Sequence, residues 1–388
     1  MKTAENKFDD IRPYCDSEIH AAMNRIADDP LFPVLSSFVF PERPVEEIRE
    51  MVRNIDCIRD FQMKVMYTVN RQIIDRSTTG FSYSGIGRLD PGKRYTFVSN
   101  HRDIMLDASI LQMILAGNGL ETTEITFGAN LMQGGLVVDI GKSNKMFRVE
   151  RPGGSMREFL NASRHLSEYI RHTVLEKRQS VWIAQRNGRT KDGIDRTDQG
   201  IINMLRAGGP DDKVRSLCEL NIVPVAVSYE WEPCDILKAA ELCAREQGPY
   251  AKKPGEDLNS ILTGIRQPKG RVHFSICRPV TEEDLEPYSD LRSNDFNRQA
   301  AALIDRRICS AYRLMPNNYI AHDILSGTMS HSNRYTPEER AAFIGYMSSL
   351  GSSGASGDID RLRSVFLGIY ANPVDSAAQF AEKDERNS

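Results

Sequence analysis

Three short runs of apolar residues constrain the fold of this chain more than any other feature. They cover residues 180–185 (SVWIAQ), 222–230 (IVPVAVSYE) and 271–277 (RVHFSIC). None of them alternates apolar and polar residues, as a strand with one solvent-exposed face does. Such continuous apolar runs are typical of strands that are buried on both faces. Segments with the apolar spacing of helices lie between these runs. We therefore predict an α/β fold in which helices flank a mixed, mostly parallel sheet.

Helical patterns lie on both sides of this region. Apolar residues recur with helical spacing in segments 17–29, 44–55 and 56–77, with a proline-rich break after the first segment. The second segment can run on into the third, and residues 290–375 return to helix. We predict three parts: an N-terminal helical domain (bundle) at 1–78, an α/β domain at 79–290 and a C-terminal helical extension at 291–388.

Composition bears on several classes of function. The formal net charge of -3 gives no electrostatic argument for binding nucleic acid. No window approaches the roughly 20 apolar residues of a membrane span, and the N-terminus lacks the apolar core of a signal peptide. We therefore expect a cytoplasmic protein. The seven cysteines contain no CxxC pair, so free thiols are expected rather than disulfides or a zinc knuckle.

The most informative segment joins a predicted strand to a predicted helix. The apolar residues 94–100 (RYTFVSN) end directly before His101, and a helical pattern begins a few residues later. Ligand sites of parallel sheets lie beyond the carboxyl ends of the strands, which is where His101 is expected. Asp103 and Asp107 follow closely. A carboxylate that accepts the Nδ1 proton of His101 leaves Nε2 free to act as a general base toward a hydroxyl.

Two other interpretations of this segment stay open. The acidic residues also suit the N-terminus of a helix, where Asp103 alone is a good cap. A mononuclear metal site is a third interpretation, but no second histidine lies close in sequence. We predict no metal site in the chain.

The segment 99–107 (SNHRDIMLD) resembles the signature block of the glycerolphosphate and lysophosphatidate acyltransferases, which is a histidine, four residues and an aspartate. Three later segments resemble the other blocks of that family in the same order: 145–151 (KMFRVER), 182–190 (WIAQRNGRT) and 222–227 (IVPVAV). The resemblance covers residues 80–280, and the spellings NHRD and AQRxGR are most similar to a bacterial subgroup. It implies that 79–290 is an acyltransferase domain.

Two positions depart from the family pattern. Asp107 comes six residues after His101, one more than in the family, so either Asp107 or Asp103 would orient the imidazole. Asn187 stands where the family has a glutamate; asparagine keeps hydrogen-bonding capacity but has no charge.

The resemblance implies direct transfer of a fatty acyl group from a thioester to a hydroxyl of a glycerolphosphate or lysophospholipid-type acceptor. The donor would be acyl-ACP or acyl-CoA, with no bound cofactor. The absence of a GxSxG elbow fits transfer without an acyl-enzyme. The acceptor would be an anionic lipid precursor, which arginine forks suit. The expected binding residues are Arg102, Arg148, Arg151, Arg186, Asn187, Gly188 and Arg189, of which Arg151 and Arg189 match the family blocks best. The protein would lie at the inner face of the membrane.

Three alternatives to this function remain. Within the same chemistry, the acceptor can be a monoacylated amino-acid lipid, which offers a carboxylate instead of a phosphate. The shifted Asp107 and the Asn187 substitution are also compatible with a catalytically degenerate lipid-binding module. A soluble hydrolase would release fatty acid without an acceptor, but no nucleophile motif is visible.

Overall fold

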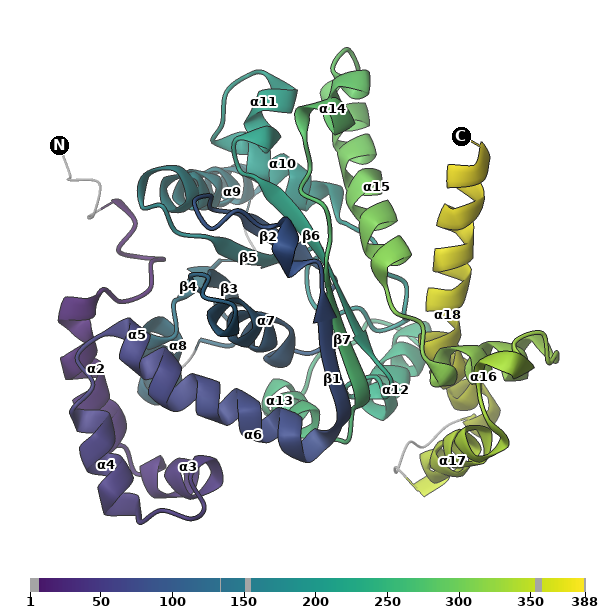
Figure 1. The fold of residues 1–388 in the computed structure, drawn as a ribbon, viewed down its shortest axis with the longest axis horizontal. Coiled ribbons are helices and arrows are strands. Elements are labelled where there is room, and N and C mark those ends of the chain that lie inside the picture. The colour runs from purple at the N-terminus through teal and green to yellow at the C-terminus, as the bar shows by residue number, and fades with distance from the viewer. Residues whose placement is uncertain (1–6, 133, 151–154, 353–357, 387–388) are drawn as a thin grey trace.

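The computed structural model describes residues 7–132, 134–150, 155–352 and 358–386, and these residues form one mixed sheet surrounded by helices (Figure 1). The sheet has seven strands. This confirms the predicted α/β class. The strands are β1 (Thr78–Ser84), β2 (Thr96–Ser99), β3 (Glu124–Gly128), β4 (Met146–Val149), β5 (Val181–Ala184), β6 (Ile222–Tyr229) and β7 (Gly270–Ile276).

The strand order is β1-β7-β6-β2-β5-β3-β4, and every neighbouring pair is parallel except β6 and β7. The five strands from β6 to β4 therefore end at one edge of the sheet. Because β7 is antiparallel to β6, the residues just before β7 lie at that same edge. The neighbouring strand β1 is parallel to β7, so the residues just before β1 also lie at this edge. We call it the carboxyl edge.

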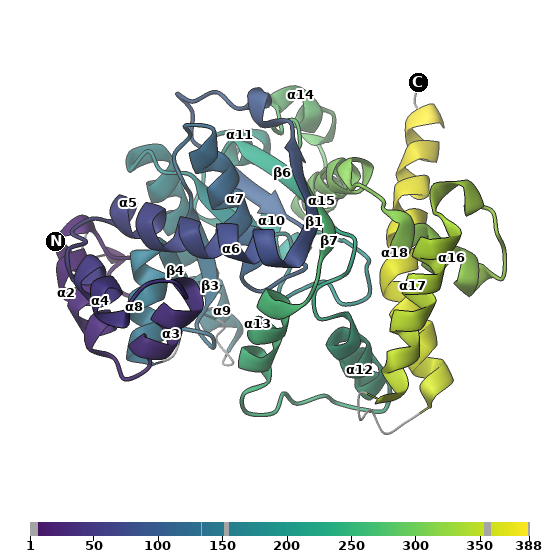
Figure 2. The ribbon, with the colours of Figure 1, turned by 60° about the horizontal axis from the view of Figure 1, so that its bottom comes forward.

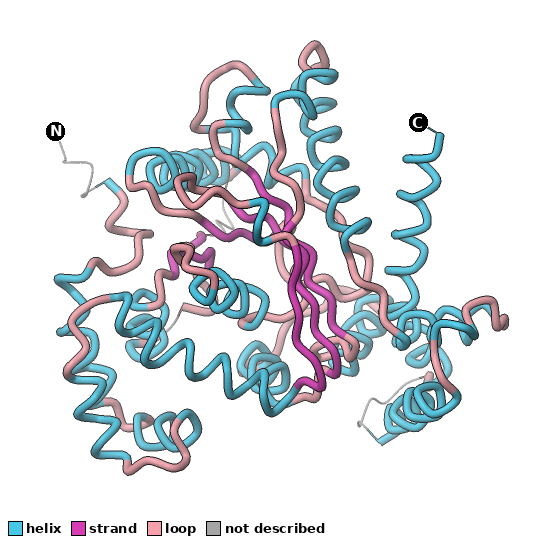
Figure 3. Tube along the Cα trace, in the orientation of Figure 1, coloured by secondary structure: helices cyan, strands magenta, loops and turns pink. Residues whose placement is uncertain are grey.

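Both faces of the sheet are covered, as the continuous apolar strands predict. Along β6, Ile222 and Ala226 belong to the core on one face, while Val223, Val225 and Val227 belong to the core on the other. Figure 1 shows α6 (Tyr67–Ser77) and α7 (Leu106–Gly117) on one side of the sheet. On the other side lie α9 (Met156–Arg171), α10 (Gln199–Ala207), α11 (Lys213–Cys218) and α15 (Ser293–Ala311). The strands gather in the centre of the molecule (Figure 3).

The N-terminal helices form a core of their own, as Figure 1 shows at the left. They are α2 (Asp16–Asp28), α3 (Phe32–Val39), α4 (Val45–Arg53) and α5 (Ile58–Phe61), followed by a π-helical turn and α6. The proline-rich break separates α2 from α4 as expected, but it also contains the helix α3, which tolerates Pro33 because proline fits the first turn. The second and third segments, whose continuity the sequence left open, are separated at residues 54–57.

Asp139 on α8 (Gly135–Ser143) ties the N-terminal helices to the rest of the chain. Its carboxylate accepts hydrogen bonds from the Tyr14 hydroxyl at 2.7 Å and from Arg25 at 2.6 Å. Asp139 itself is buried. A buried carboxylate with two such donors holds α2 against α8.

The C-terminal helices also form a separate core. It joins α12 (Asp235–Glu246) to α16 (Pro316–Ser326), α17 (Pro337–Ser348) and α18 (Ile359–Arg386). In contrast, α6 and α15 pack on the sheet, although the predicted boundaries place them in the terminal domains. The three-domain division itself stays a prediction. Among the described helices, none combines the length and the apolar character that crossing a membrane requires.

Candidate active site

His101 follows β2 at the carboxyl edge, and its imidazole pairs with Asp107. His101 Nδ1 lies 3.0 Å from Asp107 Oδ2. When Nδ1 donates this hydrogen bond to the carboxylate, the lone pair of a neutral imidazole is on Nε2. Within the part of the chain that the structure describes, no hydrogen bond to Nε2 occurs, and the side chain is 14% exposed. The edge of the ring meets Trp182 of β5 at a centroid distance of 5.6 Å.

Both oxygens of the Asp107 carboxylate accept hydrogen bonds. Besides the imidazole, Oδ2 accepts the backbone N–H groups of Arg102 at 2.6 Å and Asp103 at 2.9 Å. Oδ1 accepts the Tyr229 hydroxyl at 2.8 Å, from the end of β6. Asp107 is fully buried in the first turn of α7. These contacts leave the carboxylate one orientation, and the histidine that it holds is fixed with it.

Asp103 has a different structural role. Its Oδ1 accepts the backbone N–H groups of Met105 and Leu106, both at 2.9 Å, and so caps the start of α7. Burial raises the pKa of Asp103, and the negative charge of Asp107 raises it further. Of the two carboxylates that the sequence left open, Asp107 is therefore the one that contacts the imidazole. The capping interpretation holds for Asp103 only.

Arg102 does not point to a ligand site. It is 1% exposed, and it donates to Asp195 at 2.6 Å and to Glu232 at 3.2 Å. Burial alone would lower its pKa, but the two carboxylates raise it well above the ordinary value. Lys238 also pairs with Glu232 and donates to the Arg102 carbonyl at 2.8 Å. The expectation that Arg102 binds an anionic acceptor is wrong, because its charge is already compensated inside the protein.

The loop after β5 brings two other arginines close to His101. The Thr190 N–H donates to the His101 carbonyl at 2.7 Å, which joins the two loops. Neither Arg186 nor Arg189 forms an ion pair with any described residue, and both are half-buried. Arg189 Nη1 is buried and has no hydrogen-bond partner among those residues. Asn187 and Gly188 are exposed at the turn, where the φ of Gly188 is +74°.

The remaining two predicted arginines belong to β4 and the residues that follow it. Arg148 is exposed and pairs with Glu150 at 2.6 Å. Arg151, one of the two best family matches, lies outside the described residues. Of the predicted binding residues, the structure therefore places Arg186, Asn187, Gly188 and Arg189 together on the loop that touches the His101 loop.

Several residues at the carboxyl edge were not identified from the sequence. Tyr229 ends an apolar strand, and that position was an available signal. Lys269 precedes β7 and donates to the Gln267 carbonyl at 2.8 Å; burial lowers its pKa to about 8. Asp195 and Glu232 neutralise Arg102 from two distant loops. No local pattern marks such partners, because only the tertiary fold brings them together.

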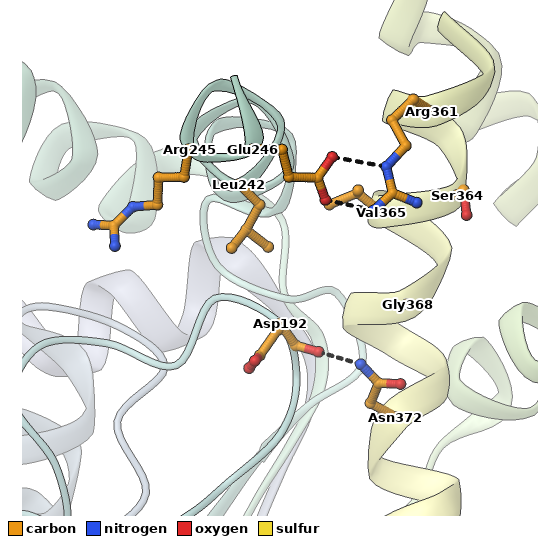
Figure 4. Close-up of a pocket in the computed structure, with 9 residues that line it drawn as sticks. All are labelled: Asp192, Leu242, Arg245, Glu246, Arg361, Ser364, Val365, Gly368 and Asn372. Atoms are coloured by element: carbon orange, nitrogen blue, oxygen red, sulfur yellow. Dashed lines mark hydrogen bonds and ion pairs between the residues drawn. The ribbon is translucent and has the colours of Figure 1, made fainter. Parts of the chain in front are cut away.

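A cavity of about 380 Å³ lies between α12 and α18 (Figure 4). Glu246 and Arg361 form an ion pair across its mouth, and Asn372 donates to the Asp192 carbonyl at 2.7 Å. None of the residues around His101 lines it. The lining residues are Asp192, Leu242, Arg245, Glu246, Arg361, Ser364, Val365, Gly368 and Asn372.

No model of a known protein family matches this sequence, and no curated protein matches it either. Among solved structures, the chain is similar to the 1-acyl-sn-glycerophosphate (LPA) acyltransferase PlsC from Thermotoga maritima. The TM-score is 0.37 and the sequence identity 11%, over 74% of this chain and 93% of the other. The likeness in fold is therefore a loose one.

The chemistry available at this edge follows from the groups themselves. An oriented imidazole with a free Nε2 can take a proton from a hydroxyl and return it to a leaving group. Two arginines without carboxylate partners lie on the adjoining loop and can bind an anion. A base beside two arginines that form no ion pair with the described residues suits a substrate that carries both a hydroxyl and an anionic group.

Proposed function

We propose that this protein is an O-acyltransferase that moves a fatty acyl group from a thioester to a hydroxyl of a glycerolphosphate or lysophospholipid-type acceptor. The observation that carries the proposal is the pair of His101 and Asp107, with Nδ1 and Oδ2 3.0 Å apart and Nε2 free of protein partners in the described residues. The donor would be a thioester of acyl carrier protein or coenzyme A. The resemblance of the four sequence segments supports the same chemistry.

His101 would act as the base and then as the acid. Nε2 accepts the acceptor's hydroxyl proton while the hydroxyl oxygen bonds to the thioester carbonyl carbon. The carbonyl electrons move to oxygen and form a tetrahedral oxyanion. When this intermediate collapses, the carbon–sulfur bond breaks, and the proton on Nε2 passes to the thiolate. Asp107 stabilises the imidazolium that exists between the two proton transfers.

The anionic group of the acceptor would bind the loop after β5. The unpartnered Nη1 of Arg189 is a buried donor, and leaving such a donor without an acceptor costs free energy. A phosphate or carboxylate oxygen would satisfy it. The arginine fork takes either group, so a monoacylated amino-acid lipid remains the alternative acceptor.

The decisive experiment is His101→Ala assayed for thiol release with a panel of glycerolphosphate, lysophosphatidate and monoacylated amino-acid lipid acceptors. We expect the rate to fall by roughly two to four orders of magnitude. His20→Ala is the matched control, because His20 also pairs with a carboxylate, Asp56 at 2.9 Å, on the surface of the N-terminal helices. This variant should keep the wild-type rate.

The outcomes separate the candidate functions. Retention of most activity by His101→Ala would exclude the general base. Wild-type protein that binds acyl chains but releases no thiol above background would be a lipid-binding module. Release of fatty acid without any acceptor would indicate a hydrolase.

We also propose that the protein contacts a membrane surface through exposed apolar side chains. Val34 of α3, Met156 of α9 and Leu258 of α13 (Glu256–Arg266) are 69%, 72% and 59% exposed. These elements lie in the lower part of the view of Figure 2. The exposed Arg157 next to Met156 adds positive charge that suits anionic lipids. Apolar side chains of this kind enter the headgroup boundary of a bilayer.

Sedimentation with vesicles tests this contact. We expect wild-type protein to pellet with phosphatidylglycerol vesicles at low salt, and the combination of Val34→Asp and Met156→Asp to reduce the pelleted fraction several-fold. Leu325→Asp changes a side chain that is also exposed, 46%, on α16 and should have no effect. Equal pelleting of all three proteins would contradict the proposed surface.

A further inference from the structure

Three side chains that commonly bind metal ions converge at the end of α16. His322 and Asp323 lie in the last turn of this helix, and His331 lies in the following loop, just before a short 3₁₀ turn. One ligand atom from each residue lies within 4.8 Å of the other two. The cluster lies outside the site around His101, and the sequence analysis predicted no metal site; eight residues lie between the two histidines.

His322 presents a ring nitrogen that lacks a partner. Its Nδ1 is buried and forms no hydrogen bond to any described residue. Its Nε2 lies 3.3 Å from the Asp375 carboxylate on α18. If Nε2 carries the proton for that carboxylate, Nδ1 has the lone pair. A carboxylate on one imidazole nitrogen and a metal ion on the other is the usual arrangement around metal-binding histidines.

Asp323 supplies an anionic group that the fold already positions. It is 2% exposed, and it accepts the Tyr335 hydroxyl at 2.8 Å and Ser330 Oγ at 3.1 Å. The His331 backbone N–H contacts both of its oxygens, at 3.1 and 3.2 Å. A carboxylate has about four lone-pair positions, and because the two oxygens share one His331 N–H, only three donors occupy them, which leaves capacity for a metal ion. They also bring the loop with His331 back over the helix.

The His331 ring is held by aromatic contacts and keeps its nitrogens available. Its centroid lies 5.1 Å from the Tyr319 ring and 4.9 Å from the His322 ring, which it meets edge to face. None of the described residues accepts or donates a hydrogen bond at its ring nitrogens. Two imidazoles and one carboxylate suit Zn²⁺ and related first-row ions, whereas Mg²⁺ and Ca²⁺ prefer sites made of oxygen alone.

We propose that His322, Asp323 and His331 bind one Zn²⁺-class ion, with Asp375 orienting His322 from α18. Tetrahedral zinc with bonds of about 2.0–2.1 Å separates its ligand atoms by roughly 3.4 Å, so ligand atoms that now lie within 4.8 Å of one another would approach by at most about 1.4 Å on binding. The ion would fasten the 327–336 loop to α16 and, through Asp375, to α18. Three protein ligands leave room for water as a fourth.

Calorimetric titration of the chelator-treated full chain with Zn²⁺ tests the proposal. We expect each chain to bind one Zn²⁺ ion tightly and its melting temperature to rise by several degrees, with no comparable response to Mg²⁺ or Ca²⁺. Co²⁺ should give the visible absorption bands of a four- or five-coordinate site with nitrogen and oxygen ligands. His322→Ala and His331→Ala should each abolish tight Zn²⁺ binding.

Two further variants keep the test decisive. His101→Ala removes the imidazole at the carboxyl edge and should still bind one Zn²⁺ tightly. If this variant lost tight Zn²⁺ binding, the ion would bind at His101 and not at His322, Asp323 and His331, which would overturn the proposal. Asp375→Asn changes a side chain that is 68% exposed, so the fold is preserved. We expect it to weaken Zn²⁺ binding by about 10- to 100-fold. Unchanged affinity in both Asp375→Asn and His331→Ala, or no stoichiometric binding by the wild type, would equally overturn it.

Discussion

Four groups contact the Asp107 carboxylate: the His101 imidazole, two backbone amides and the Tyr229 hydroxyl. The side-chain carboxylate of Asp103, four residues earlier, contacts neither His101 nor Asp107 and caps α7 instead. The two aspartates thus differ in function although both are buried and both follow His101 closely. Residue type and spacing alone could not separate them.

Replacing each aspartate by asparagine should show this difference. Asp107→Asn removes the acceptor that orients the imidazole and stabilises its charged form, so we expect the acyl-transfer rate to fall by roughly two to four orders of magnitude. Asp103→Asn keeps a good helix cap, and we expect a rate within a few-fold of the wild type. Steady-state kinetics of both variants check this. An equal loss of rate in both variants would contradict the distinction between Asp103 as a helix cap and Asp107 as the partner of His101.

At the scale of elements, the antiparallel pairing of β7 with β6 places at the carboxyl edge residues that lie far from His101 in sequence. Helix α13 precedes β7, and it approaches the His101 loop so closely that a Cβ on Gly264 would lie 2.2 Å from Asp103 Oδ2. Glycine is needed here for the close approach and not for its backbone conformation.

Gly264→Ala should therefore push α13 away from the His101 loop. We expect a loss of stability of about 1–3 kcal/mol, as for overpacking in a core, together with reduced activity. Gly345→Ala is the matched control, because Gly345 lies in α17 and a methyl group added there would meet no described atom within 4 Å. Alanine there should leave stability unchanged or raise it by about 0.5–1 kcal/mol. Urea unfolding measures both; equal effects would contradict the close approach.

The elements themselves were largely predictable. Residues 222–230 and 271–277 contain continuous apolar runs, and both form strands of the sheet. The helix α3 was not predictable, because Pro33 and the prolines near it indicate a break between helices and not a helix. The sequence predicted that His101 lies next to a strand end and pairs with Asp103 or Asp107, and the structure shows the contact with Asp107. The partners Tyr229, Asp195 and Glu232 were not, since hydrogen bonds between distant loops leave no periodic signal.

At the scale of the whole molecule, the carboxyl edge buries an unusual amount of charge. Arg102, Lys238, Asp195 and Glu232 neutralise one another within it. Lys269 is 1% exposed, and its ammonium donates to the Gln267 carbonyl and to Ser77 Oγ without a carboxylate. Burying such a group makes folding depend on pH.

We expect stability to rise with pH in the alkaline range because of Lys269. Its pKa is lowered from 10.5 to about 8 in the folded protein, so between these values the unfolded chain binds more protons and the free energy of unfolding increases with pH. The full gain is roughly 3 kcal/mol. Below pH 8 both states are protonated and the gain is absent. Urea unfolding from pH 7.5 to 10 measures the slope.

The comparison of variants isolates this effect. Lys269→Met should flatten the rise, whereas the exposed Lys93→Met should keep the wild-type slope. If Lys269→Met and the wild type change in parallel over this range, the lysine does not carry the dependence.

Tyr370 of α18 contacts the loop that carries Glu232, although it lies far along the chain. Its hydroxyl donates to Asp235 at 2.6 Å and accepts the Glu232 N–H at 3.0 Å. A nascent chain that has released every strand from the ribosome still lacks this hydroxyl until residue 370 emerges. The hydrogen bonds that hold the Glu232 loop are therefore completed late in synthesis, and a product terminated before α18 would expose to chaperones a sheet whose carboxyl edge lacks these bonds.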